Sequence, residues 1–164
     1  MRPSPDPVRP GQESVWDYPR PPALVASSEL VKVWFGGELI AETRSSFRIL
    51  ETSHAPAYYL PATDVTPGVI RPNESTSWCE YKGMARYGDL IVGDHISRGA
   101  CWWYPEPAAG YEELLDTISF YPQRVSACEV DGETVSPLQS SFYGDWPTSR
   151  IAGPYKGAPG TEGW

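Results

Sequence analysis

A lysine next to a glycine is the residue of this chain best suited to do chemistry. Lys82 lies in the stretch Cys-Glu-Tyr-Lys-Gly, and the 164 residues include only two other lysines. A lysine held by a turn can bind an anionic group as a point charge, or attack a carbonyl carbon to form a Schiff base. The plainer alternative is a solvated lysine at the end of a strand.

A cysteine precedes this lysine by three residues. A nearby cation favours the thiolate, which is the nucleophilic form of cysteine, so Cys79 is an alternative nucleophile to Lys82. Free cysteines are mostly buried and behave as small apolar side chains, so Cys79 can equally line a pocket. We expect the two remaining cysteines, Cys101 and Cys128, to lie in the core.

A carboxylate at the end of a β-prone run completes the candidate catalytic set of Lys82, Cys79 and Glu51. Along a strand, Ile49 and Glu51 share one face, while Arg48 lies on the other. If Ile49 faces inward, Glu51 is a buried carboxylate that needs a partner, and Lys82 is the partner we expect. The alternative is an edge carboxylate in water.

Aromatic side chains form the second group of candidates, since Trp, Tyr and Phe make up 13% of the chain. In extended segments, Tyr58 and Tyr59 point to opposite faces. Trp102 and Tyr104 share one face, with Trp103 on the other. Aromatic walls around a few polar groups are typical of ligand pockets, although aromatic residues also build cores. The pocket that we predict is lined by Arg48, Glu51, Tyr59, Cys79, Lys82, Tyr87, Trp102 and Tyr104.

Charge and composition exclude several classes of function. The net charge of −8 argues against a nucleic-acid-binding domain, which needs a basic face. No apolar run approaches the roughly 20 residues of a membrane helix, and the N-terminus has no signal sequence. Three cysteines without CxxC spacing predict no zinc site and free thiols in a reducing cytoplasm. We expect no metal or cofactor; the expected partner is a small molecule, and a homodimer stays open.

The elements that must position these residues are mostly short strands. Gly36-Gly37, Gly93-Asp94 and Asp131-Gly132 each separate two β-prone runs, which predicts three hairpins. Apolar residues at helical spacing predict one helix over residues 108–118. The Pro-rich residues 1–14 are interpreted as a flexible arm, and residues 15–164 as a single domain that ends in an irregular tail from about 136 to 164. The fold class is therefore mainly β, with short antiparallel strands in a barrel-like or two-sheet arrangement with one helix.

Several motifs, taken in order, resemble a bacterial family known as domain of unknown function 427. They are found at residues 48–61, 76–87, 92–94, 101–107 and 119–124. The resemblance implies a small, mainly-β domain with a tent-like pair of sheets, an architecture whose other members often hold zinc through cysteine pairs. Those pairs are missing here. The family also carries a nucleotidyltransferase-like label, but this chain lacks the Gly-Ser element and spaced acidic pair of such enzymes.

The chain departs from the family pattern beside two candidate residues. Glu80 replaces the proline of the usual Thr-x-Cys-Pro-x-Lys-Gly motif, which adds a charge beside Lys82. Trp103 replaces the serine of the usual Trp-Ser-Tyr-Pro motif, a change that could reshape a pocket.

Three hypotheses of function follow. The first is a domain that binds a small anionic or carbonyl-bearing molecule between aromatic walls. The second is an enzyme, a hydrolase or transferase, with Lys82 or Cys79 as nucleophile and Glu51 or His54 as proton carrier. A lone histidine in a loop is more often structural. The third is a protein-interaction domain that uses the aromatic tail, in particular Phe142, Tyr143 and Trp146.

Overall fold

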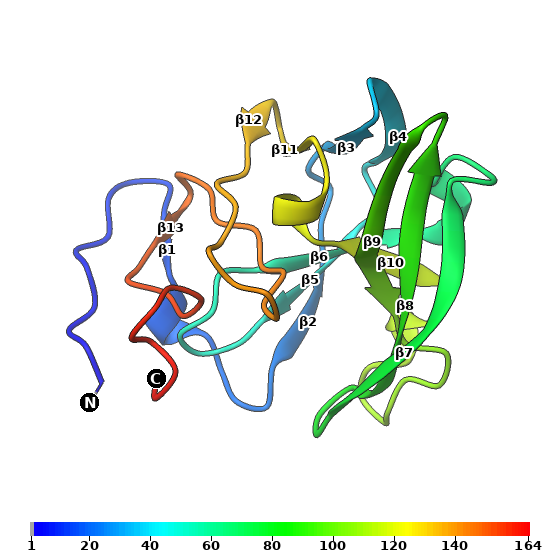
Figure 1. The fold of residues 1–164 in the computed structure, drawn as a ribbon. Coiled ribbons are helices and arrows are strands. Elements are labelled where there is room, and N and C mark those ends of the chain that lie inside the picture. Colours follow the sequence, from blue (N-terminus) through cyan, green and yellow to red (C-terminus); the bar gives the residue numbers. More distant parts are fainter. Residues whose placement is uncertain (1) are drawn as a thin grey trace.

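Two antiparallel sheets and a small parallel ribbon make up the computed structural model, which describes residues 2–164 (Figure 1). The seven-stranded sheet has the order β2-β5-β6-β10-β9-β8-β7 and consists of β2 (Ala23–Ala26), β5 (Phe47–Leu50), β6 (Ala57–Pro61), β7 (Ile70–Cys79), β8 (Gly83–Val92), β9 (His95–Trp103) and β10 (Thr117–Phe120). The four-stranded sheet consists of β3 (Val31–Phe35), β4 (Glu38–Thr43), β11 (Ala127–Val130) and β12 (Glu133–Thr134). The large sheet keeps two free edges, β2 and β7, so the mainly-β prediction is confirmed without a closed barrel.

All three predicted hairpins are present. The β3–β4, β8–β9 and β11–β12 pairs are antiparallel and turn at the predicted glycines. In the last of them Val130 pairs with Glu133, and the two turn residues, Asp131 and Gly132, have φ of 48° and 83°. Positive φ at both positions is the type I′ geometry that the Asp-Gly pair predicts.

The predicted helix over residues 108–118 is wrong. Only Glu112–Leu114 (η3) form a 3-10 turn, and Thr117–Phe120 (β10) extend into the sheet between β6 and β9. Gly110 and Asp116 have φ of 94° and 60°, which interrupts a helix on both sides. The apolar spacing therefore reflected a buried turn followed by a strand. The other 3-10 turns are η1 (Val15–Asp17), η2 (Ala62–Asp64) and η4 (Pro122–Arg124).

The alternation of side chains along the strands separates two cores on opposite faces of the large sheet. The first core lies between the two sheets and includes Val33, Tyr58 and Phe120. The second core includes Tyr59 and Trp102 on the opposite face. Neighbouring residues such as Tyr58 and Tyr59 therefore belong to different cores, as predicted. Cys101 and Cys128 are buried in the first core, also as predicted.

The two ends of the chain lie together, away from β7–β9 (Figure 1). β1 (Glu13–Ser14) pairs in parallel with β13 (Ile151–Ala152), and the amide of Asp6 donates to the carbonyl of Gly153 at 2.8 Å. A third apolar cluster includes Trp16, Ile151 of β13 and Leu50 of β5, so it joins the two ends of the chain to the large sheet. The flexibility of residues 1–14 stays a prediction.

Candidate ligand-binding site

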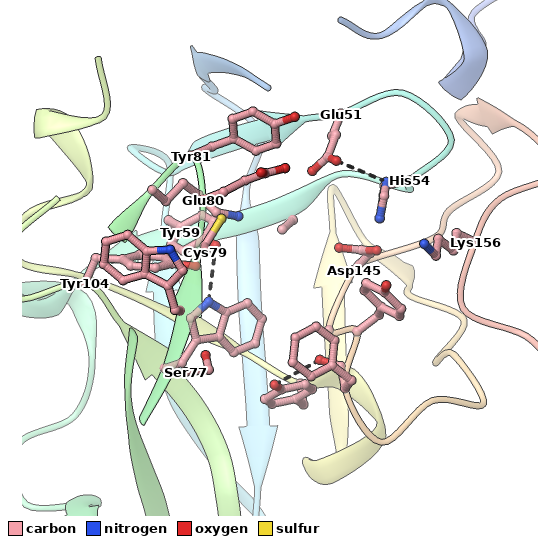
Figure 2. A pocket seen from close by; sticks show the side chains of 18 of the residues that line it. Glu51, His54, Tyr59, Ser77, Cys79, Glu80, Tyr81, Tyr104, Asp145 and Lys156 are labelled. Atoms are coloured by element: carbon pink, nitrogen blue, oxygen red, sulfur yellow. Dashed lines mark hydrogen bonds and ion pairs between the residues drawn. The ribbon is translucent and has the colours of Figure 1, made fainter. Parts of the chain in front are cut away.

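One cavity combines aromatic walls with buried charged groups. It has a volume of about 340 Å³ and opens on the face of the large sheet that carries the second core (Figure 2). Its walls come from the loop after β5, the turn between β7 and β8, strands β6 and β9, and the tail around residues 142–156. Figure 2 shows Tyr59 and Tyr104 on one side of the pocket and Asp145 on the other. The pocket thus has two distinct ends.

The turn between β7 and β8 places Lys82 at the first end. Gly83, with φ of 109°, opens β8, and the amide of Ala108 donates to the carbonyl of Lys82 at 2.9 Å. The Lys82 ammonium lies 5.9 Å from the ring centre of Tyr59 and 5.6 Å from that of Tyr104. These distances are typical of cation–π contacts.

The ammonium of Lys82 has no hydrogen bond or ion pair with the residues that the structure describes. Burial alone would lower the pKa of this amine. The electrostatic effect of the acidic groups around it, Tyr59 being the largest, outweighs burial and raises the pKa above its ordinary value. Lys82 is therefore a protonated, unpaired cation at the pocket wall.

Glu51 lines the same pocket, but its partner is not Lys82 as we expected. The Glu51 carboxylate pairs with the Nε of Arg20 at 3.3 Å and lies 4.0 Å from the Nδ1 of His54. Arg20 comes from the Pro-rich segment before β2 and also donates to the carbonyl of Thr52 at 3.0 Å. The strand spacing predicted Glu51 on the same face as Ile49, and Glu51 lines the pocket, whereas its partner Arg20 comes from outside that segment.

Besides Lys82 and Glu51, five predicted residues line this pocket: Tyr59, Cys79, Tyr87, Trp102 and Tyr104. The indole of Trp102 donates to the hydroxyl of Tyr59 at 3.2 Å, and their rings meet edge to face. The hydroxyl of Tyr87 shares a 2.8 Å hydrogen bond with that of Ser77. Burial raises the pKa of Tyr104 far above its ordinary value, so this phenol stays protonated. Cys79 also lines the pocket at the end of β7.

The structure does not bring Arg48 into the pocket. Its guanidinium pairs with Glu13 at 2.7 Å and lies 5.9 Å from the ring centre of Tyr58. Alternation along β5 is the reason: Ile49 belongs to the second core, so its neighbour Arg48 faces the other way. Arg48 therefore fastens the N-terminal segment to the sheet.

Asp145 is the residue that sequence reasoning missed. Its Oδ2 atom is buried and has no hydrogen-bond partner. Burial raises the pKa of this carboxyl to about 6, although the positive potentials of His54 and Lys82 act to lower it. Asp145 lies in the glycine- and proline-rich tail, where no motif or spacing marks it. Asp145 becomes a candidate site residue only because the fold brings it into the lining of the pocket.

A close approach of the tail to the sheet places Asp145. A Cβ atom on Gly144 would lie 2.5 Å from the Trp102 ring and 2.9 Å from that of Tyr121, so only glycine fits there. The Tyr121 hydroxyl donates to the carbonyl of Phe142 at 3.1 Å. The side-chain amide of Gln123 donates to the carbonyl of Tyr143 at 2.8 Å. The tail is thus fixed as the second wall of the pocket.

The tail aromatic residues have three different environments. Trp146 is fully buried and donates from its indole to the carbonyl of Phe120 at 2.9 Å. Tyr143 lines the pocket, whereas Phe142 at its rim is 60% exposed. Trp146 therefore covers the core, which leaves Phe142 as the main exposed aromatic residue for an interaction surface on the tail.

His54 lies between Glu51 and Asp145, two of the three carboxylates that line the pocket (Figure 2). Its Nδ1 lies 3.0 Å from the carbonyl of Thr52, which can only accept, so Nδ1 carries a proton. In the neutral ring Nε2 is then a hydrogen-bond acceptor. The hydrogen bond to the backbone thus fixes the His54 ring, and the same nitrogen lies near the Glu51 carboxylate.

A family model described as domain of unknown function (DUF427) matches residues 23–131, so the chain belongs to this family. No curated protein matches the chain. The matched segment includes Lys82 and Trp102, but it ends before Asp145. In residues 2–164 there is no cluster of three or more histidine, cysteine or acidic side chains that could hold a metal ion. That part of the chain also has no helix long and apolar enough to span a membrane.

Proposed function

We propose that this pocket binds a small molecule that places an anionic or carbonyl group against Lys82 and an apolar body between the aromatic walls. The observation that carries the proposal is the unpaired ammonium of Lys82 within 6 Å of two ring centres. An unpaired charge in a partly buried site carries a desolvation cost, and an anionic ligand would offset that cost. The volume of about 340 Å³ suits a ligand built on a single ring.

The raised pKa of Lys82 favours this binding role over a role as nucleophile. A Schiff base forms from the neutral amine, and the groups around Lys82 keep its amine protonated. A protonated lysine at a pocket wall instead recognises negative charge or a carbonyl oxygen.

The experiment uses benzoate as the probe, measured by calorimetry on the whole chain. We expect benzoate to bind and the Lys82→Met variant to bind it about tenfold more weakly or worse. Lys32→Met is the matched control, because Lys32 pairs with Glu42 on the other sheet and lies outside the pocket. Absence of benzoate binding, or equal binding by Lys82→Met, would contradict the proposal.

An enzyme that uses Cys79 as nucleophile is the second candidate, and the observation that favours it is the position of Cys79 in the same pocket as two groups able to carry protons. Asp145, whose carboxyl has a pKa of about 6, and His54 both line the pocket. The test compares Cys79→Ala with the unchanged chain for binding and turnover of benzoate esters. Retained binding with lost turnover supports catalysis, and an absence of turnover in the unchanged chain opposes it.

A further inference from the structure

The two ends of the pocket carry unmatched charges of opposite sign. At one end the ammonium of Lys82 faces the rings of Tyr59 and Tyr104. At the other end the buried Oδ2 of Asp145 has no hydrogen-bond donor. Both residues line the same cavity, yet the structure of residues 2–164 has no ion pair between them. This separation leaves room for a ligand between them.

The Asp145 end offers several acceptors, and no donor among residues 2–164 reaches the Oδ2 of Asp145. With the proton on Nδ1, Nε2 of His54 is an acceptor in the neutral ring, and the Glu51 carboxylate is already paired with Arg20. Lys156 also lines the pocket, but its ammonium lies 3.4 Å from the carbonyl of Trp164 and 5.4 Å from the ring centre of Tyr143. A buried acceptor without a donor is costly, so this end is suited to a group that brings N–H donors or positive charge.

We propose that the ligand is dipolar, with a carboxylate or carbonyl group at Lys82 and an ammonium or other N–H group at Asp145. An amine-bearing carboxylic acid with an aromatic or other apolar body is the class of molecule that fits both ends and the walls between them. This inference rests on the proposed function and extends it, since the proposed function requires only the Lys82 end.

The Asp145 end also predicts how binding depends on pH. The groups that face Asp145 are His54, Lys82, Glu51 and Lys156. Because burial raises the pKa of Asp145 to about 6, its carboxyl is mostly ionised at pH 7.5 and mostly protonated at pH 5. Affinity for the ammonium end should therefore fall as the pH is lowered through 6.

The test compares two amine-bearing acids with matched acids that lack the amine. The pairs are 4-(aminomethyl)benzoate with 4-methylbenzoate, and phenylalanine with 3-phenylpropanoate, which vary the distance between the two charges. Each is titrated by calorimetry at pH 7.5 into the unchanged chain, into Asp145→Asn and into Asp94→Asn. Asp94 lies in the exposed β8–β9 turn, outside the pocket, so it controls for the loss of one negative charge.

We expect at least one amine-bearing acid to bind about tenfold more tightly than its match. This advantage should disappear in Asp145→Asn and persist in Asp94→Asn. The inference is overturned if neither amine improves binding, or if the improvement survives in Asp145→Asn. If the matched acids still bind through Lys82 in that case, the proposed function stands alone. If none of the four acids binds, both proposals fall.

Discussion

The side chain of Asp145 lowers the stability of the free protein. Native proteins pair nearly all buried polar groups, yet Oδ2 of Asp145 is buried and has no donor. A carboxyl whose pKa rises from 3.8 to about 6 on folding opposes folding wherever it must be ionised. Residues that carry such a penalty are often retained because a bound molecule compensates it.

Replacement of Asp145 by asparagine should therefore stabilise the free protein. Between pH 4 and 6 the folded state keeps a proton on Asp145 that the unfolded state releases. The free energy of unfolding therefore falls as the pH rises through this range, and the full penalty from Asp145 is present above pH 6. At pH 8 Asp145→Asn should raise the free energy of unfolding by about 1–3 kcal/mol. At pH 4 the gain should be close to zero. Urea denaturation at both pH values measures it, with Asp94→Asn as the control. A loss of stability at pH 8 would contradict the account.

At the scale of elements, the turn of the β7–β8 hairpin fixes the position of Lys82. Gly83 follows the lysine with φ of 109°, and its Cβ position lies 3.1 Å from the carbonyl oxygen of Glu106. Any side chain there strains the backbone and pushes the turn away from the segment that holds it, in which the amide of Ala108 donates to the carbonyl of Lys82. The position of the lysine therefore depends on this glycine.

A matched pair of glycine substitutions separates strain from positioning. Gly83→Ala and Gly132→Ala both force alanine into positive φ, which should cost about 1 kcal/mol of stability in each case. Gly132 has no atom near its Cβ position and lies in the β11–β12 turn, away from the pocket. Benzoate binding should weaken severalfold in Gly83→Ala alone. Equal affinities in calorimetry would show that the turn does not position Lys82.

Local chemistry made the hairpins and the sheet faces predictable, but not the helix. Asp131-Gly132 and Gly93-Asp94 define their turns within a few residues, and alternation correctly separated Tyr58 from Tyr59. The apolar spacing over residues 108–118 suits a helix as well as a buried turn. The segment forms a strand because residues 117–120 pair with β6 on one side and with β9 on the other.

At the scale of the whole molecule, the pocket joins segments that are far apart in the chain. Sequence reasoning grouped Tyr59, Cys79, Lys82, Tyr87, Trp102 and Tyr104, and all six line the pocket because they lie on, or directly beside, strands of the large sheet. It missed Asp145 and the Arg20–Glu51 pair, since both depend on where irregular segments return to the sheet. The return of the tail depends in turn on Trp146, which packs on Tyr58 with ring centres 5.0 Å apart.

Trp146 should therefore control the integrity of the fold as well as the pocket. Its side chain is fully buried and its indole donates to Phe120, so Trp146→Ala should cost about 3–5 kcal/mol of unfolding free energy. Phe142→Ala, four residues earlier in the same tail, removes a side chain that is 60% exposed and should cost less than about 0.5 kcal/mol. Urea denaturation of the two variants measures the difference. If they lost equal stability, the tail would not be part of the core, and the wall that carries Asp145 would lack the support that this structure gives it.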